Sequence, residues 1–239
     1  MSSVSIKNKL VTDFESSEAI KRLRTNVIFS GADVKVIGLT SCYEMDGKTT
    51  VSFNLAASLA QTGKKVVLLD TDLRKSILVH YAERHTRLSG LGHYLSGMVE
   101  EEDILCETDV PDFSIIFAGA RVPNPAELLG SDRFTALIRS LREKFDYIIV
   151  DTPPLGRVVD CAIMSPLLDG ILIVVNAQRN SYKVVQNVKS QLERANGKII
   201  GIVLNKVDFG EKRSYYGGKY GKYGYYYKYY YSDNGSSAD

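Results

Sequence analysis

Apolar and polar positions divide the chain into short, continuous apolar runs and longer amphipathic segments between them. Continuous apolar runs are typical of strands that are buried on both faces of a parallel sheet. The segments between them carry apolar residues at helical spacing. Strands are expected at 36–40, 66–69, 112–118, 147–150, 171–175 and 199–204, and helices at 48–62, 125–129, 134–144, around 160–168 and at 181–195.

This alternation of strands and helices predicts an α/β fold with a doubly wound, mostly parallel sheet. Each strand–helix–strand crossover should be right-handed. Residues 100–103 are acidic and are expected to form a solvated turn between two of these elements.

The start of the chain consists of a polar segment and a helical segment. Residues 1–15 are polar, and we expect them to be loosely held. A helical pattern opens at Ser16 and runs to residue 29, with Glu18, Lys21 and Arg24 largely on its polar face. That face is either solvated, with ion pairs along the helix, or a contact with a neighbouring subunit.

The strand at 36–40 leads through a polar loop into a Gly-Lys-Thr-Thr sequence and the helix that follows. Such a loop can bind phosphate, because backbone N–H groups and the positive end of the helix dipole face the anion. Lys48 would reach the β- and γ-phosphates, and the Thr49 hydroxyl would ligate Mg²⁺. The candidate nucleotide-binding residues of this loop are Asp46, Gly47, Lys48, Thr49 and Thr50.

Two positions depart from the phosphate-loop (P-loop) pattern. Cys42 stands where the pattern has a glycine, and Met45 stands where related loops carry another one. Methionine adopts positive φ poorly, so Met45 is expected to weaken phosphate binding. Taken alone, Gly-Lys-Thr is also compatible with a chance turn.

Aspartates follow two of the predicted strands. Asp70 and Asp72 come directly after the run at 66–69, with Arg74 two residues further on, and Asp151 ends the run at 147–150 as in a Walker B motif. Ligands of open α/β sheets bind outside these carboxyl ends. The carboxylates suit Mg²⁺ and proton handling beside a triphosphate, although aspartates in such places also form turns and cap helices.

Asn205-Lys206-Val207-Asp208 follows the last predicted strand. In GTPases this pattern reads guanine. The asparagine is also where nucleotide-binding relatives of other specificity contact the base. Asn205 is therefore a candidate base contact, but the tetrapeptide does not decide between nucleotides.

Charge and cysteine content narrow the function classes. The chain has 30 Lys and Arg against 28 Asp and Glu, and the small basic excess lies in residues 211–239. A neutral body argues against a dedicated DNA-binding domain. Three cysteines without a CxxC pair indicate reduced thiols of a cytosolic protein. Because no apolar run reaches the roughly 18–20 residues that span a bilayer and no signal peptide opens the chain, we expect membrane association only through a partner.

Residues 215–231 combine tyrosine with glycine and lysine alone. They cannot bury enough apolar surface to offset their ordering entropy, so residues 211–239 are expected to form a disordered tail. The segment could stack on single-stranded nucleic acid, associate with itself, or serve as a substrate through its hydroxyls. Its ten tyrosines are Tyr215, Tyr216, Tyr220, Tyr223, Tyr225, Tyr226, Tyr227, Tyr229, Tyr230 and Tyr231.

Together these segments resemble the bacterial tyrosine kinases that regulate capsule and exopolysaccharide synthesis. The likeness rests on the order and co-occurrence of motifs along nearly the whole chain. It includes the charged helix at 18–26, the phosphate loop, the Asp70–Arg74 segment, Gly90-Leu91 with Tyr94-Leu95-Ser96-Gly97, residues 123–129, residues 151–154 and the tyrosine tail. Lys21 replaces the family's arginine and cannot form its bidentate fork. Ser76 stands where proline often follows.

The resemblance implies a P-loop kinase domain over residues 1–210 that uses ATP and Mg²⁺. Lys48, Asp70 and Asp72 would be catalytic, with Asp70 accepting the tyrosine proton or serving as a second metal-shell ligand. Thr49, Asp72 and Asp151 would hold the metal.

The resemblance also implies partners. The tail of one subunit would enter its neighbour's site in a ring, by resemblance an octamer, held by Glu18, Lys21 and Arg24 of the helix at 16–29. A transmembrane protein of the polysaccharide export machinery would activate the kinase at the cytoplasmic side of the membrane. A tyrosine phosphatase would reset it, and no nucleic acid is expected.

The nearest relatives outside this family are the partitioning and division-site ATPases. Their loop carries a signature lysine that this chain replaces with Tyr43. A nucleotide-dependent switch without kinase activity is therefore the alternative function.

Overall fold

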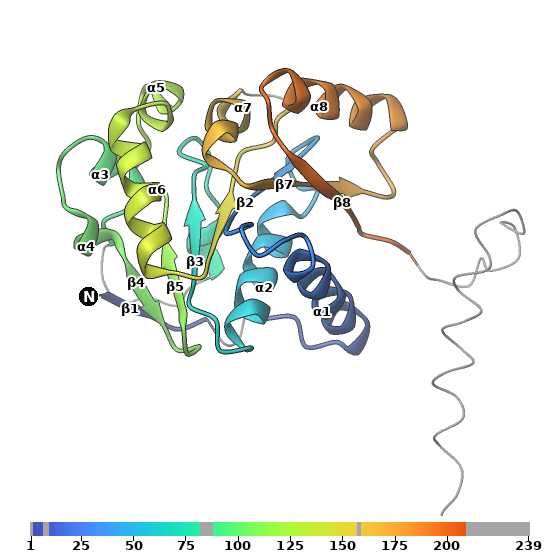
Figure 1. Cartoon of the computed structure of the whole chain (residues 1–239), viewed down its shortest axis with the longest axis horizontal. Helices are drawn as coiled ribbons and strands as arrows, with labels where there is room; N and C mark the ends of the chain where they lie inside the picture. The colour runs from blue at the N-terminus through green and yellow to red at the C-terminus, as the bar shows by residue number, and fades with distance from the viewer. Residues whose placement is uncertain (1, 7–9, 82–87, 157–158, 209–239) are drawn as a thin grey trace, which may run out of the picture. The chain divides into compact units, whose positions relative to one another are not determined.

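The structure, a computed structural model, describes residues 2–6, 10–81, 88–156 and 159–208. The chain divides into a compact unit at 1–206 and a second unit at 207–239. Nearly all described residues belong to the first unit, and the ten tail tyrosines lie outside the described residues. Within the described ranges, helices flank an eight-stranded sheet on both faces (Figure 1).

The sheet is mostly parallel, as predicted, with strand order β1-β4-β5-β3-β6-β2-β7-β8. Every neighbouring pair is parallel except β4 and β5, which are antiparallel. The strands are β1 (Ser2–Val4), β2 (Val36–Ser41), β3 (Val66–Asp70), β4 (Cys106–Thr108), β5 (Phe113–Ile116), β6 (Tyr147–Asp151), β7 (Gly170–Asn176) and β8 (Ile199–Asn205).

Side-chain caps and one proline define several helix starts. Asp13 Oδ1 accepts a hydrogen bond from Ser16 N at 2.8 Å, and Ser131 Oγ accepts one from Phe134 N at 3.3 Å. Pro125 opens its helix, where no N–H is needed. The helices are α1 (Phe14–Ile28), α2 (Lys48–Ala60), η2 (Leu78–Tyr81), α3 (Leu91–Leu95), α4 (Glu101–Ile104), α5 (Pro125–Leu129), α6 (Asp132–Lys144), α7 (Asp160–Met164), η3 (Ser165–Leu167) and α8 (Tyr182–Arg194).

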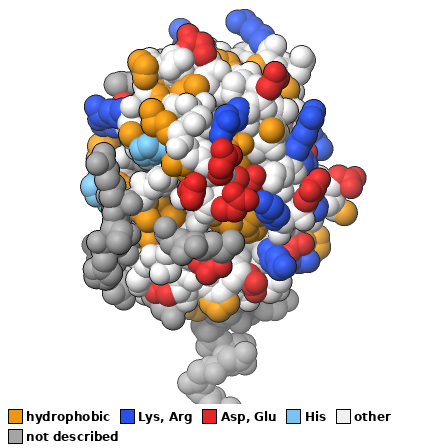
Figure 2. Space-filling view, turned by 90° about the vertical axis from the view of Figure 1, so that its left-hand side faces the viewer, with side chains coloured by type: hydrophobic (Ala, Val, Ile, Leu, Met, Phe, Trp, Pro, Cys, Tyr) orange, Lys and Arg blue, Asp and Glu red, His pale blue; other side chains and the backbone are white. Residues whose placement is uncertain are grey.

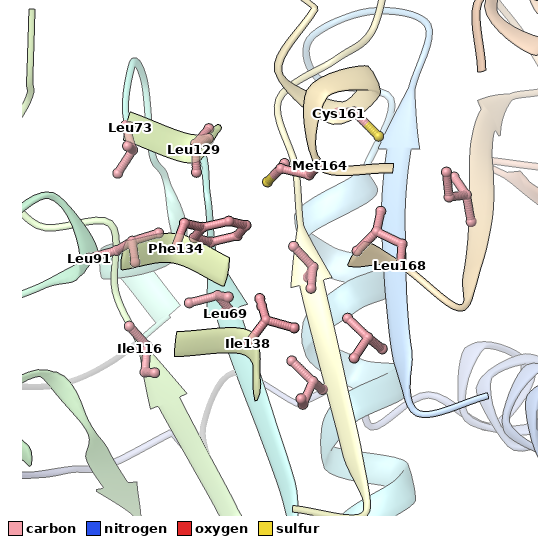
Figure 3. Packing of buried hydrophobic residues seen from close by; sticks show 14 of the residues in the cluster. Leu69, Leu73, Leu91, Ile116, Leu129, Phe134, Ile138, Cys161, Met164 and Leu168 are labelled. Carbon is pink, nitrogen blue, oxygen red and sulfur yellow. The ribbon is translucent and has the colours of Figure 1, made fainter. Parts of the chain in front are cut away.

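Successive side chains of a strand point to opposite faces of the sheet, so an apolar core forms on each face. In β3, Val67 and Leu69 belong to one cluster, and Val66 and Leu68 belong to the other. The first cluster packs the sheet against α6, α7 and α8, and part of it is seen in Figure 3, where Phe134 and Ile138 of α6 lie over Leu69. The second packs it against α1 and α2. The burial of both faces explains the continuous apolar runs.

The expectation that residues 1–15 are loosely held was wrong in part. Residues 2–4 form the edge strand β1, and Val4 and Ile6 are buried. Asp109 fixes the segment by accepting hydrogen bonds from Ser5 Oγ at 2.6 Å and Ile6 N at 2.9 Å. A strand of three residues with so few apolar positions leaves too short a pattern to read. The helix also begins earlier than predicted, because Asp13 is its cap instead of Ser16.

The acidic segment at 100–103 is also more ordered than a turn, since residues 101–104 form the one-turn helix α4. Lys144 Nζ lies 2.7 Å from Glu101 Oε1, and Arg133 Nη2 lies 3.6 Å from Glu100 Oε2. Figure 2 shows the side of the molecule turned to the left in Figure 1, where acidic side chains gather near the centre with basic ones around them.

Among the helices that the structure describes, we find no candidate for a membrane span.

Candidate active site

The carboxyl ends of three adjacent strands bring the predicted motifs together. In the sheet, β6 lies between β3 and β2, and Asp70 of β3 pairs in register with Asp151 of β6. On the other side, Leu39 of β2 pairs with Asp151, two residues before β2 runs into the loop. Segments separated by up to about a hundred residues therefore meet at one edge, as expected of a parallel sheet.

The loop between β2 and α2 contains two residues with positive φ, one of which is the departure Met45. Met45 adopts φ 64° and Gly47 φ 93°, both in the left-handed region. The Met45 side chain is 81 % exposed, so it points into solvent and does not fill the loop. At Gly47 a Cβ atom would lie 2.1 Å from Asn205 Nδ2, so this position requires glycine.

Asp46 shapes the loop from inside. Its side chain is buried, and its Oδ2 accepts a hydrogen bond from Tyr43 N at 2.8 Å. Its peptide oxygen accepts one from Asn205 Nδ2 at 2.9 Å. The amide group of Asn205, a candidate base contact, is therefore bound to the loop backbone.

Asp151 gathers three side chains from the first turns of α2. Its Oδ1 accepts from Lys48 Nζ at 2.8 Å and from Ser52 Oγ at 2.9 Å. Its Oδ2 accepts from Thr49 Oγ1 at 2.7 Å. Lys48 and Asp151 are both buried, so this ion pair is shielded from solvent. The cation and hydroxyl predicted in the loop thus contact the Walker B carboxylate directly.

Asp70 is a second buried carboxylate of the site. Its Oδ1 accepts from Asp72 N at 3.1 Å, and its Oδ2 accepts from Ser76 Oγ. Burial, and after it the negative charge of Asp151, raises the pKa of Asp70 to about 7. Near neutral pH this carboxyl can both release and accept a proton.

Asp72 and Arg74 order the segment that follows β3. Asp72 is half-buried, and its Oδ1 accepts from Arg74 N at 3.3 Å and Lys75 N at 2.9 Å, so the carboxylate closes a turn. Arg74 forms a bidentate pair with Asp160 of α7, with Nε–Oδ2 and Nη2–Oδ1 both at 2.9 Å. The guanidinium thereby ties this segment to the element that follows the Walker B strand.

The donor set fits Mg²⁺ only together with a phosphate. Proteins bind this ion through one or two carboxylates, substrate phosphates and waters. The Thr49 hydroxyl and the Asp151 carboxylate, which are in contact, supply two such oxygens. The described residues contain no group of three or more His, Cys, Asp or Glu side chains that could hold a metal. Asp70, Asp72 and Asp151 therefore do not form a three-carboxylate metal site.

A cavity of about 290 Å³ opens beside the Asp72 segment. Leu73, Val79, Leu88 and Phe117 supply apolar walls, and Asp72, Ser76, His93 and Arg121 line it with polar groups. Gly90 N donates to His93 Nδ1 at 3.1 Å, which leaves Nε2 as the donor of the neutral ring. The cavity therefore combines apolar walls with polar groups.

The remaining predicted site residues lie elsewhere. Thr50 Oγ1 lies 2.6 Å from Tyr81 Oη on the far side of α2's first turn. On α1, Glu18 pairs with Lys21 at 2.7 Å, while Arg24 Nη1 donates to Ser58 O and Ser58 Oγ of α2 at 3.1 and 3.2 Å. Arg24 thus has a role within the subunit that its place on a charged face did not indicate.

Sequence reasoning missed Ser52 and Asp160. Ser52 lies four residues after Lys48, which places both side chains on one face of α2, and this spacing could have identified it. Asp160 lies 86 positions from Arg74 and carried no local signal.

Comparisons with known proteins agree with this geometry. The AAA domain family matches residues 34–201. The tyrosine-protein kinase CpsD of Streptococcus agalactiae is 41% identical over 219 residues, which cover 92% of this chain and 94% of the relative.

Solved structures give the same picture. The chimerical protein CapA2B2 is 29% identical with a TM-score of 0.76, over 87% of this chain and 94% of that one. The kinase domain of the Escherichia coli tyrosine kinase ETK is 31% identical with a TM-score of 0.74, over 83% and 80% of the two chains. More distant is the septum site-determining protein MinD of Pyrococcus horikoshii, complexed with Mg-ADP, at 25% identity and a TM-score of 0.60 over 74% and 72%. The chain therefore belongs to the AAA domain family and to the bacterial tyrosine kinases.

Proposed function

We propose that this protein is an ATP-dependent tyrosine kinase that phosphorylates the tyrosines of its own C-terminal segment between subunits and regulates capsule or exopolysaccharide synthesis. The observation that carries the proposal is the joint contact of Lys48, Thr49 and Ser52 with Asp151 behind a phosphate-loop backbone. The ten clustered tyrosines at 215–231 supply the acceptor.

The site residues divide the work of phosphoryl transfer. Lys48 offsets charge on the transferring group, and the N–H groups of the loop hold the phosphates. Thr49 and Asp151 would hold Mg²⁺, which when bound would supply further neutralisation of phosphate charge. The phenol oxygen of an acceptor tyrosine bonds to the γ-phosphorus, the bond from that phosphorus to the bridging oxygen breaks, and ADP leaves. Asp70 takes the phenol proton, for which its raised pKa suits it.

Asp72 has a positioning role in this scheme. Its carboxylate closes the turn that brings Arg74 to Asp160 and Ser76 to Asp70. The acceptor ring enters the cavity beside this turn, which Leu73, Phe117 and His93 line. Asn205 supports the nucleotide site by donating a hydrogen bond to the peptide oxygen of Asp46 in the loop.

The reaction occurs between subunits. By resemblance, Glu18 and Lys21 of α1 contact a neighbouring subunit in a ring of eight. Each phosphate adds about −1.5 to −2 charges, so three or four would make the basic tail strongly acidic and drive it from the neighbouring site. A membrane-anchored protein of the export machinery activates the ring, and a tyrosine phosphatase resets it.

The competing function is a nucleotide switch without kinase activity. The likeness to MinD, a protein solved with Mg-ADP, favours it. Incubation of the purified chain with ATP and Mg²⁺, followed by mass spectrometry, separates the two functions. Phosphate on Tyr215–Tyr231 that is absent in Lys48→Met supports the kinase, and ATP turnover with an unmodified tail supports the switch.

A further inference from the structure

Three consecutive peptide oxygens of the phosphate loop are bound from outside by the ends of β7 and β8. The oxygen of residue 44 accepts from Arg179 Nη1 at 3.1 Å, and that of residue 45 accepts from Lys206 Nζ at 2.7 Å. The oxygen of residue 46 accepts from Asn205 Nδ2 at 2.9 Å. Arg179 also lies over the Tyr43 ring, 4.9 Å from its centre. A run of three such bonds fixes the orientation of three successive peptide planes.

These planes decide where the loop N–H groups point. The C=O and N–H of a trans peptide point in opposite directions. Holding the oxygens of residues 44–46 outward therefore directs the N–H groups of residues 45–47 to the inner side of the loop. Inward N–H groups at a helix N-terminus are what binds phosphate.

Met45 makes this support more necessary than it is in a glycine-containing loop. At φ 64° a methionine is strained, whereas glycine adopts this conformation freely. Its side chain is exposed, so packing of that side chain does not hold the peptide in place. The bond from Lys206 to the Met45 oxygen is charge-assisted and is the shortest of the three.

We infer that Lys206 is a positioning residue of the nucleotide site, which keeps the peptide of Met45 in its left-handed conformation so that the loop amides face the phosphates. Asn205 and Arg179 support the neighbouring peptides. The Asn-Lys pair after β8 thus acts on the phosphate loop itself. This inference rests on the proposed nucleotide binding.

The test is the affinity for ADP with Mg²⁺, measured by the fluorescence of a labelled ADP. Lys206→Met should weaken binding about fivefold, since the bond is charge-assisted but solvent-exposed. Lys206→Arg, which keeps a cationic donor, should recover most of the affinity. In a Met45→Gly background the loss should fall below about twofold, because glycine needs no support at this φ.

Lys198→Met is the matched control, since Lys198 is an exposed lysine just before the other end of β8. It should bind ADP as the unaltered chain does. The inference is overturned if Lys206→Met binds as the unaltered chain does, or if its loss is equally large with Met45→Gly. If the unaltered chain binds no ADP at all, the proposed function fails and this inference fails with it.

Discussion

Lys48 Nζ lies 2.8 Å from Asp151 Oδ1, so the cation expected to face the phosphates and the carboxylate expected to face the metal neutralise each other in a buried site. Thr49 and Ser52 donate to the same carboxylate. In this arrangement each of the two buried charges has a counter-charge.

This pairing predicts a coupled effect on stability. Lys48→Met should lower the free energy of unfolding by about 3 kcal/mol, because it leaves the Asp151 charge buried and unpaired. Asp151→Asn should lower the free energy of unfolding by a similar amount, because it leaves the Lys48 charge buried and unpaired. The double variant should be more stable than the sum of the two losses indicates, by about 2 kcal/mol or more. Urea unfolding of the four proteins measures this coupling.

The matched control is the ion pair of Lys144 and Glu101, whose lysine is about half exposed. The corresponding Lys144→Met and Glu101→Gln cycle should give a coupling of at most about 1 kcal/mol. Equal coupling in the two pairs would contradict the claim that the Lys48–Asp151 pair is shielded.

Asp70 should give the protein a characteristic pH dependence. Its carboxyl has an ordinary pKa of 3.8 and a pKa of about 7 when folded. Between these values the folded state holds a proton that the unfolded state has released, so stability falls as pH rises through this window. Asp70→Asn should reduce this loss of stability with rising pH. The free energy of unfolding of Asp70→Asn, relative to that of the unaltered chain, should therefore be higher at pH 8 than at pH 4.

Urea unfolding without metal at pH 4, 5, 6, 7 and 8 measures the difference between the two proteins. A constant difference across this range would show that Asp70 titrates normally. In activity, Asp70→Asn should be less harmful than Lys48→Met, because charge neutralisation outweighs base strength in a loose transition state.

The cysteines should be inert in the native protein. Burial, with the charge of Asp46, raises the pKa of Cys42 to about 11, and burial raises that of Cys161 to about 11. At pH 8 only about one such thiol in a thousand is ionised. We expect a disulfide reagent to modify them only after urea is added. Rapid modification of the native chain would contradict their burial.

Two variants of α1 should separate assembly from folding. The Lys21 side chain is 51% exposed, and Lys21→Glu should lower the oligomer mass measured by light scattering while costing at most about 0.5 kcal/mol of unfolding stability. Arg24 donates to Ser58, so Arg24→Ala should cost about 1 kcal/mol of stability. An unchanged mass for Lys21→Glu would remove this face from the proposed ring.

Periodicity predicted six of the eight described strands and the strand ends that carry Asp70 and Asp151. It could not identify β1 or β4, because three residues give no period. The loop backbone was harder, because the conformation of Met45 depends on Lys206, 161 residues away. The Arg74–Asp160 pair is equally non-local. Contacts of this kind follow from the folded sheet edge and leave no local pattern in the sequence.

Transfer between subunits is tested most directly by mixing two variants, neither of which can phosphorylate its own tail. One chain keeps the site but has phenylalanine at each tyrosine of 215–231, and the other is full-length Lys48→Met. After incubation with ATP and Mg²⁺, mass spectrometry should find phosphate on Tyr215–Tyr231 of the Lys48→Met chain. Unmodified tyrosines in that chain, while the unaltered protein phosphorylates its own tail, would contradict transfer between subunits.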